Sequence, residues 1–185
     1  MGRLIIPAGP LIPGRPRGRV LARATTPINH AAAGLLTTPV DISSVTLPTE
    51  RTVEIFMGAV FSGYNYFLAG LYRDVSTLVI KSVANSAGNL LVSWEIREAT
   101  GPVEKLIPTI VSSNTIVATQ DVTVTDVGDL TRARLHPGGS WAATAPAFQA
   151  ENISAPILID TTTVRLYANR VASIVTCYCP IILER

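Results

Sequence analysis

Charged and aromatic side chains are scarce in this 185-residue sequence. Charged residues make up 15% of the chain, against about 25% in a typical soluble domain, and aromatic residues make up 6%. Hydrophobic residues make up 48%. This composition excludes a disordered protein, an acidic tail and a coiled coil. It is also too apolar for a lone monomer, so we expect the chain to bury surface against copies of itself.

Cysteine and histidine are equally scarce, with two of each. Cys177 and Cys179 share one face of a predicted strand, are poorly placed to bond to each other, and are expected to be buried thiols. His30 and His136 are scattered, which favours structural roles. The sequence has no Walker loop, G-x-G-x-x-G, H-E-x-x-H or G-x-S-x-G motif. We therefore predict that the protein is not an enzyme and uses no cofactor and no metal site.

Two groups of acidic residues lack the spacing that their candidate chemistry needs. Asp121, Asp126 and Asp129 do not match an EF-hand, and a solvated strand end and turn explains them better. Glu95 and Glu98 flank Arg97, which indicates a polar strand edge rather than a pair of catalytic carboxylates.

β-Branched residues dominate what is present, with 20 Thr, 18 Val and 17 Ile, and this favours sheets. Residues 90–96 alternate between an apolar face and a more polar one, as a half-buried strand does. Residues 62–71 are ambiguous and could include a short helix. The other predicted strands cover residues 51–61 with a bulge or kink at Gly58, 75–83, 115–127, 130–135, 153–160, 162–168 and 172–183.

The arrangement of these segments predicts the fold class. Nothing repeats at a fixed period, which argues against solenoids and propellers. Asn-Gly and Asp-Gly hairpins are absent, which favours long connections between sheets. We predict an all-β fold, an eight-stranded antiparallel jelly-roll sandwich over residues 45–185, with an extended N-terminal arm over residues 1–44.

The predicted arm contains no acidic residue before Asp41. Residues 1–40 carry a net charge of +5 and the rest of the chain carries −3. Prolines at every third position, from Pro7 to Pro16, favour polyproline II. Without an aromatic residue the arm offers no stacking surface for bases, so its contacts with nucleic acid would be electrostatic and independent of sequence. The predicted phosphate-binding residues are Arg3, Arg15, Arg17, Arg19 and Arg23. A solvated arm without a partner and a ligand for SH3-type domains are the alternatives.

Two segments carry a family resemblance. Residues 67–80, FLAGLYRDVSTLVI, lead from an aromatic-Tyr-Arg step into a strand, and residues 172–183, ASIVTCYCPIIL, form an apolar last strand. With the basic arm, these resemble coat proteins of small icosahedral RNA viruses, most closely the tymovirus type. The likeness covers roughly residues 45–183. The arm departs from the tymovirus pattern because it is more basic, which leaves satellite-virus and other plant or insect virus coats open.

The resemblance implies a capsid protein that assembles in many copies into an icosahedral shell around genomic RNA, found in the virion and, during assembly, in the host cytoplasm. Polyamines or divalent cations would complete the charge balance of a large genome. No membrane partner is expected, because the long uncharged run 55–72 contains polar residues and suits a sheet better than a membrane span. The alternatives are a non-viral or phage β-sandwich that assembles without nucleic acid, and a monomeric binding or enzyme domain.

Overall fold

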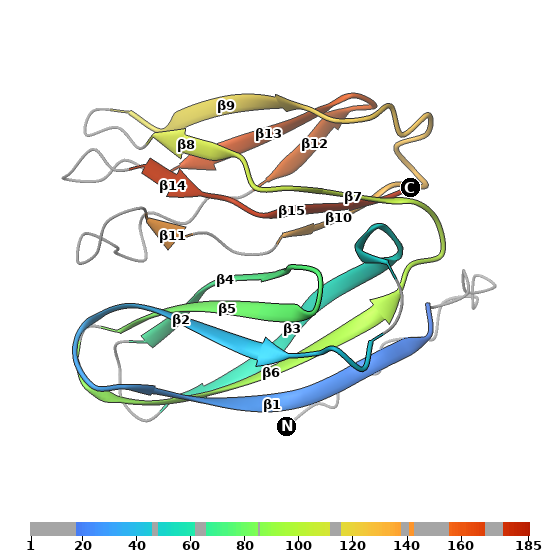
Figure 1. Ribbon diagram of the computed structural model, residues 1–185. Coiled ribbons are helices and arrows are strands. Elements are labelled where there is room, and N and C mark those ends of the chain that lie inside the picture. Colours follow the sequence, from blue (N-terminus) through green and yellow to red (C-terminus); the bar gives the residue numbers. More distant parts are fainter. Residues whose placement is uncertain are drawn as a thin grey trace, which may run out of the picture.

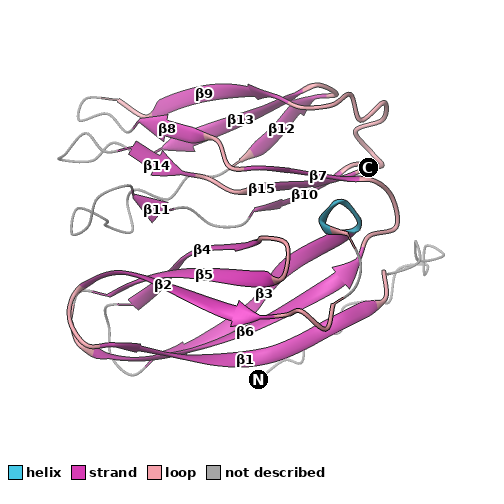
Figure 2. Cartoon of the chain, in the orientation of Figure 1, coloured by secondary structure: helices cyan, strands magenta, loops and turns pink. Residues whose placement is uncertain are grey.

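The computed structural model describes residues 18–45, 48–61, 66–84, 86–111, 116–137, 141–142, 156–168 and 176–185. Within these residues the regular structure consists of fifteen strands and one turn of 3-10 helix, η1 (Thr49–Arg51) (Figures 1 and 2). All strand pairs are antiparallel. The predicted all-β class is therefore confirmed.

The part of the chain between residues 18 and 98 builds one small sandwich, which we call the first sandwich. One of its sheets has the order β1-β6-β3 and the other has the order β2-β5-β4. The strands are β1 (Val20–His30), β2 (Gly34–Asp41), β3 (Thr52–Phe61), β4 (Tyr66–Arg73), β5 (Thr77–Ala84) and β6 (Gly88–Glu98). Side chains from both sheets meet in a core that includes Ile28, Leu71, Ile80 and Val92.

The part between residues 103 and 185 builds the second sandwich. Its strands are β7 (Val103–Leu106), β8 (Thr109–Val111), β9 (Ala118–Thr123), β10 (Arg134–Pro137), β11 (Trp141–Ala142), β12 (Ile157–Asp160), β13 (Thr163–Ala168), β14 (Thr176–Tyr178) and β15 (Ile181–Glu184). By their hydrogen bonds, these strands form three three-stranded sheets with the orders β10-β15-β7, β11-β14-β8 and β12-β13-β9. Its core includes Ile110, Val164, Leu166 and Leu183.

Two prolines divide what is otherwise a continuous ladder in the second sandwich. The pairs Thr109–Tyr178 and Leu106–Ile181 keep the same register on either side of the break. The backbone N–H of Cys179 donates to the carbonyl oxygen of Pro108 at 2.9 Å. Since Pro108 and Pro180 have no N–H to donate, the ladder is interrupted there but does not shift. We therefore treat β7/β8 and β14/β15 as two creased strands, and β10/β11 as the third strand of their sheet.

With the creased strands counted once, the two sandwiches have the same topology. In each, the first strand pairs with the sixth and the sixth with the third, while the second pairs with the fifth and the fifth with the fourth. Figure 1 shows them stacked, with the sheet that contains β7 and β15 turned toward the first sandwich. The chain thus repeats one six-stranded unit, which the sequence analysis did not detect.

Equivalent strands also match residue by residue. From Thr77 in β5 and from Thr163 in β13, buried positions alternate with half-buried ones in the same phase. Each of these strands follows a tight turn that begins at an aspartate, Asp74 or Asp160. The residues that enter the core are Leu90, Val92, Trp94 and Ile96 in β6, and Cys177, Cys179, Ile181 and Leu183 in β14/β15. The prediction that both cysteines are buried thiols is confirmed.

Several finer predictions were less accurate. The eight-stranded jelly roll is not confirmed, because the described strands pair in sheets of three whereas a jelly roll has sheets of four. The arm was predicted over residues 1–44, but residues 20–41 form β1 and β2 and pair with β6 and β5. In the ambiguous segment 62–71, residues 66–71 belong to strand β4 rather than to a helix. The irregularity predicted at Gly58 is confirmed by a register shift between Phe56 and Gly58.

Candidate functional site

The structure describes two of the five predicted phosphate-binding arginines. Arg3, Arg15 and Arg17 lie outside the described residues. Arg19 lies next to the start of β1 and Arg23 lies within it. Both side chains are exposed, at 72% for Arg19 and 59% for Arg23, but each already has a carboxylate partner. Their role as phosphate ligands stays a prediction, and any phosphate would bind beside these carboxylates.

Arg23 shares the carboxylate of Glu95 with Arg97. Glu95 lies opposite Arg23 in the β1–β6 ladder and its side chain is fully buried. The guanidinium of Arg23 donates to Glu95 Oε2, and Nε of Arg97 donates to Oε1. Burial alone would raise the pKa of Glu95, but the hydrogen bonds and charges of the two arginines outweigh it and hold the pKa below its ordinary value. The carboxylate is therefore a fixed negative centre beneath two cations.

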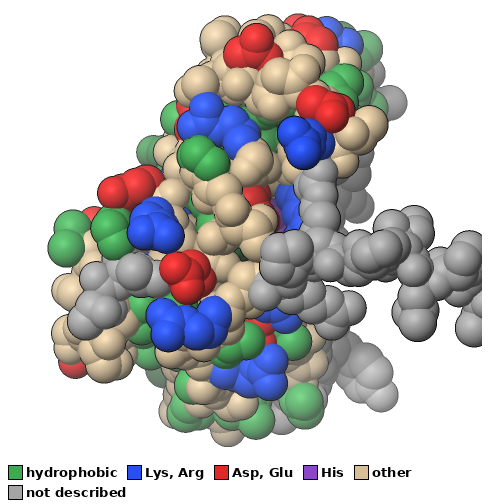
Figure 3. Space-filling view, turned by 90° about the vertical axis from the view of Figure 1, so that its right-hand side faces the viewer, with side chains coloured by type: hydrophobic (Ala, Val, Ile, Leu, Met, Phe, Trp, Pro, Cys, Tyr) green, Lys and Arg blue, Asp and Glu red, His purple; other side chains and the backbone are tan. Residues whose placement is uncertain are grey.

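A second triplet lies at the end of the same sheet. Nε of Arg19 is 3.4 Å from one carboxylate oxygen of Glu98, and Arg51, at the end of η1, reaches the other oxygen at 3.5 Å. Together with the first triplet, this gives four arginines around two glutamates, and the group keeps a net charge of +2. We call these six residues the arginine face; Glu95 and Glu98 lie three positions apart on β6, so the second triplet adjoins the first around the end of the sheet. Figure 3 shows that basic and acidic side chains lie interspersed over the end of the molecule that it displays.

The second sandwich shows what the same strand positions look like without this cluster. Val20 lies opposite Arg97 in the first sandwich, and Val103 lies opposite Glu184 in the second, so these pairs are equivalent. By the same register Lys105 takes the place of Arg23, and Ile182 takes the place of Glu95. In the second sandwich this face is apolar enough to pack against the first sandwich, through Val103 and Ile182. The arginine face is therefore particular to the first sandwich.

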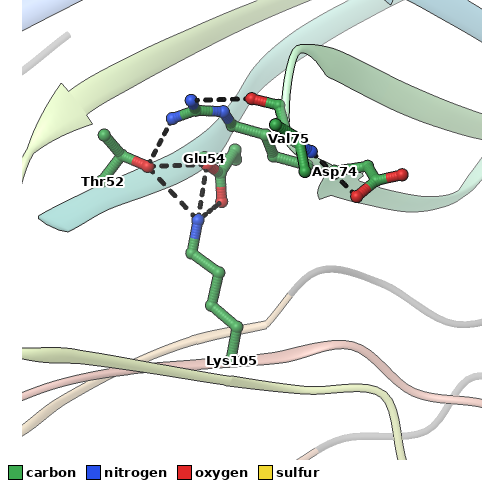
Figure 4. Close-up of polar contacts among 6 residues, drawn as sticks. Thr52, Glu54, Asp74, Val75 and Lys105 are labelled. Carbon is green, nitrogen blue, oxygen red and sulfur yellow. Dashed lines mark hydrogen bonds and ion pairs between the residues drawn. The ribbon is translucent and has the colours of Figure 1, made fainter. Parts of the chain in front are cut away.

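Lys105 belongs to a second polar cluster, which lies between the two sandwiches. Its Nζ donates to both carboxylate oxygens of Glu54 at 2.7 Å and to Oγ1 of Thr52 at 3.3 Å. Arg73 also donates to Thr52 Oγ1, at 2.8 Å, and to the carbonyl oxygen of Val75 at 3.3 Å. Figure 4 shows Lys105 entering this group from the second sandwich, whereas the other residues belong to the first. One lysine thus joins the two units.

Burial governs the electrostatics of this cluster. Glu54 has no exposed side-chain surface and Arg73 is nearly buried. Burial lowers the pKa of Lys105, and the negative charge of Glu54 opposes that shift only in part. A cavity of about 250 Å³ lies beside the cluster, with Tyr72, Ile107 and Pro180 in its lining. The Lys105–Glu54 ion pair and Arg73 form part of the lining of this cavity.

The sequence analysis missed this cluster, although one local signal pointed to it. Glu54 stands between Val53 and Ile55 in a strand that is otherwise apolar at this point. A carboxylate in a buried strand needs a cation nearby, because an unpaired buried charge is costly. What the sequence does not reveal is that the partner would be Lys105 of the other sandwich.

A third polar group holds the connection between the sandwiches, residues 99–102, against the last strand, β15. The backbone N–H and the hydroxyl of Thr100 donate to Oε1 of Glu184 at 2.9 and 2.7 Å. Nε2 of His136 lies 3.3 Å from the other oxygen of Glu184. Burial would raise the pKa of Glu184, but the bonds from Thr100 and the contact with His136 lower it overall. His136 therefore lies beside an acid, and it belongs to the contact between the connection and the last strand.

The remaining candidate residues have structural partners. His30 is buried, its Nε2 lies 2.9 Å from Oγ of Ser82, and burial lowers its pKa. Asp126 and Asp129 accept backbone N–H groups within their own turns, as predicted for a turn. Asp121 forms two hydrogen bonds with Arg165, at 2.6 and 2.8 Å.

The described part of the chain holds no group of three or more His, Cys, Asp or Glu residues that could bind a metal ion. No helix among the described residues is long and apolar enough to cross a membrane. No family model, curated protein or solved structure matches this chain. Two features of the described residues remain as candidates for function. One is the net positive charge of the arginine face, and the other is the buried Lys105–Glu54 ion pair between the two sandwiches.

Proposed function

We propose that this protein is a structural subunit that assembles in many copies and binds the phosphates of RNA, in the manner of a viral coat protein. In this proposal Arg3, Arg15 and Arg17 make the main phosphate contacts, and the arginine face extends them onto the sheet. The particle would be the virion, assembled in the host cytoplasm. The eight-stranded jelly roll is not needed for it, since two stacked six-stranded sandwiches also offer faces for association.

The observation that carries the proposal is the contrast between equivalent faces of the two sandwiches. Where the second sandwich has Ile182, the first has Glu95 with Arg23 and Arg97 bonded to it. A net positive face directly after a basic N-terminal segment suits a polyanion. A guanidinium group can bind a phosphate through two parallel N–H···O hydrogen bonds. The guanidiniums of Arg19 and Arg23 are partly exposed and keep N–H groups that can form such bonds.

The low content of charged residues, 15% of the chain, and the exposed hydrophobic side chains support the assembly part of the proposal. The described residues include large hydrophobic side chains that are more than 40% exposed in the single chain, among them Val60, Leu91, Ile116 and Ile157. Val60 and Leu91 are direct cross-strand partners in β3 and β6, so they form a contiguous apolar patch, and such a patch favours association with other copies. A self-assembling β-sandwich without nucleic acid is the alternative, and it differs in lacking any dependence on the arginines.

The test is light scattering after size exclusion, with the ratio of absorbance at 260 and 280 nm, on protein purified without nuclease at low and high salt. We expect a particle far larger than the 19.7 kDa chain, carrying nucleic acid. The variant R3Q/R15Q/R17Q should lose the nucleic acid, whereas R132Q/R134Q/R165Q, which removes the same charge from the second sandwich, should keep it. A particle without nucleic acid would favour the alternative, and a 19.7 kDa species under every condition would overturn the proposal.

A further inference from the structure

The contact between the two sandwiches, which we call the seam, is much smaller than the core of either unit. Among the described residues, each sandwich has its own cluster of nine buried hydrophobic residues. In the same part of the chain, the apolar cluster at the seam joins three buried residues, Val53 from the first sandwich with Val103 and Ile182 from the second. The Lys105–Glu54 ion pair lies at the same contact. Separating the sandwiches would therefore leave both cores intact.

The covalent link across the seam is short. Four residues, 99–102, lie between the last residue of β6 and the first residue of β7. Ala99 packs against the seam cluster, but the three buried residues and the ion pair lie outside this link. The second sandwich of another copy could thus make the same contacts with Val53 and Glu54 without any new complementarity, as in the exchange of an identical element between protomers.

We propose that the seam is also the interface between copies of this chain, formed when the second sandwich of one copy docks on the first sandwich of another. Two copies that exchange in this way close into a dimer with two seams, and a longer series of exchanges gives an open chain. The partner is a second copy of this protein. The inference rests on the self-assembly part of the proposed function and supplies a contact for it.

Concentration decides between the closed monomer and the exchanged form. A short connection gives the second sandwich an effective concentration on the order of millimolar at its own partner, so dilute protein keeps the seam within one chain. Exchange becomes competitive only when copies are crowded to similar concentrations, as they are in an assembling particle. A change that spoils the seam within a chain but permits it between chains should shift this balance at ordinary concentrations.

Reciprocal charge reversal makes that change. In E54K two lysines face each other across the seam of one chain, and in K105E two glutamates do. When the two variants are mixed and refolded together, exchange pairs the introduced lysine of one with the introduced glutamate of the other, and the native Glu54 with the native Lys105. We expect a 1:1 complex of about twice the 19.7 kDa mass, at least about tenfold enriched over either variant alone, the change that about 1.4 kcal/mol produces.

The double variant E54K/K105E is the matched control, since it restores an ion pair of reversed sense within one chain and should elute as the wild type does. If the double variant recovers wild-type behaviour and the mixture remains at single-chain mass, the seam forms only within a chain and the inference is wrong. Nuclease treatment, high salt and dilution to a concentration at which the wild type elutes as a single chain keep nucleic acid and larger particles out of this experiment. Its failure would leave the RNA result untouched, and loss of RNA binding would leave the exchange untouched.

A cysteine pair gives an independent answer if a charge-reversed variant does not fold. Chains carrying V53C alone and V103C alone are refolded together under oxidising conditions and separated on a non-reducing gel. Exchange predicts a disulfide-linked dimer, whereas V53C/V103C in one chain gives the intrachain link at low concentration. If the double-cysteine chain forms its link and the mixed chains form none, exchange is excluded.

Discussion

Gly18 and Gly101 hold the same position in the two sandwiches, each packed against a carbonyl oxygen at the end of the last strand. A Cβ atom added at Gly18 would lie 1.6 Å from the carbonyl oxygen of Glu98, and one added at Gly101 would lie 1.8 Å from that of Arg185. The neighbouring backbone bonds match as well, from Glu98 N–H to the Arg19 carbonyl at 2.8 Å and from Arg185 N–H to the Pro102 carbonyl at 3.0 Å. In each sandwich a glycine just before the first strand thus allows the backbone to approach the end of the last strand closely.

The first prediction is that both G18A and G101A destabilise the protein. Backbone must move to make room for the methyl group, and overpacking of this kind costs about 1–3 kcal/mol. Chemical denaturation measures the loss as a lower midpoint with an unchanged slope. An unchanged midpoint in either variant would show that the close approach is not needed.

The second prediction concerns Glu95. E95Q removes the buried negative charge and replaces one of the two carboxylate oxygens that accept from Arg23 and Arg97 by an NH2 donor, and hydrogen bonds to charged groups contribute about 1.5–3 kcal/mol. D121N, which breaks an exposed pair with Arg165, is the matched control and should cost at most about 1 kcal/mol. Equal losses of unfolding free energy in the two variants would contradict the assignment of Glu95 as a buried anchor.

The pH dependence of the Glu95 contribution follows from the sign of its shift. The folded pKa lies below the ordinary value, so the stabilisation is complete above an ordinary glutamate pKa of about 4.3 and is lost as the pH falls through the folded value. The difference in unfolding free energy between wild type and E95Q should therefore be constant near neutrality and shrink in acid. If the difference in unfolding free energy between wild type and E95Q grew in acid instead, the folded pKa of Glu95 would lie above its ordinary value, contrary to this prediction.

The third prediction is that the two cores respond separately. Ile80 and Leu166 are fully buried at equivalent positions in β5 and β13, and truncating either to alanine should cost about 2–5 kcal/mol in its own sandwich. Cys177 and Cys179 report on the second sandwich, because burial protects both thiols and raises the pKa of Cys177. Thiol labelling under native conditions should accelerate in L166A and not in I80A. Equal acceleration in both would show that the sandwiches unfold as one unit.

The fourth prediction is a salt dependence. If Arg3, Arg15 and Arg17 each neutralise one phosphate, then R3Q/R15Q/R17Q should flatten the plot of log affinity against log salt concentration by about 2 on single-stranded RNA. Titration of a fluorescent oligonucleotide at several salt concentrations measures this slope. The variant R132Q/R134Q/R165Q should keep the wild-type slope, and an equal change in both would point to net charge alone.

Local alternation was the part of the fold that the sequence could predict. The two faces of β6, the irregularity at Gly58 and the pair of strands joined after Asp160 follow from side-chain patterns within a few residues. Pairing between distant strands leaves no such pattern, and β1 and β2 were therefore assigned to an arm. Pro27 and Pro39 fit these strands because both strands lie at a sheet edge, where a missing N–H costs no ladder bond to a second neighbour.

The candidate site was harder to predict for the same reason. The arginines of the N-terminal region stood out by composition, but their partners Glu95 and Glu98 lie far along the chain. The tandem topology was missed because equivalent positions share burial rather than identity, as Trp94 and Ile181 do. A short resemblance survives in the turns that begin at Asp74 and Asp160 and end at a threonine before a buried strand.

The shared topology has an evolutionary consequence. Two units with the same strand order, the same glycine at the entrance and the same phase of burial are what duplication and fusion of one shorter gene leave behind. A shared topology leaves the surface of each unit independent of its core. In the second sandwich the sheet face carries Val103 and Ile182 and forms the joint. In the first sandwich Glu95 takes the place of Ile182 and is surrounded by Arg23 and Arg97, so one topology serves two different surfaces.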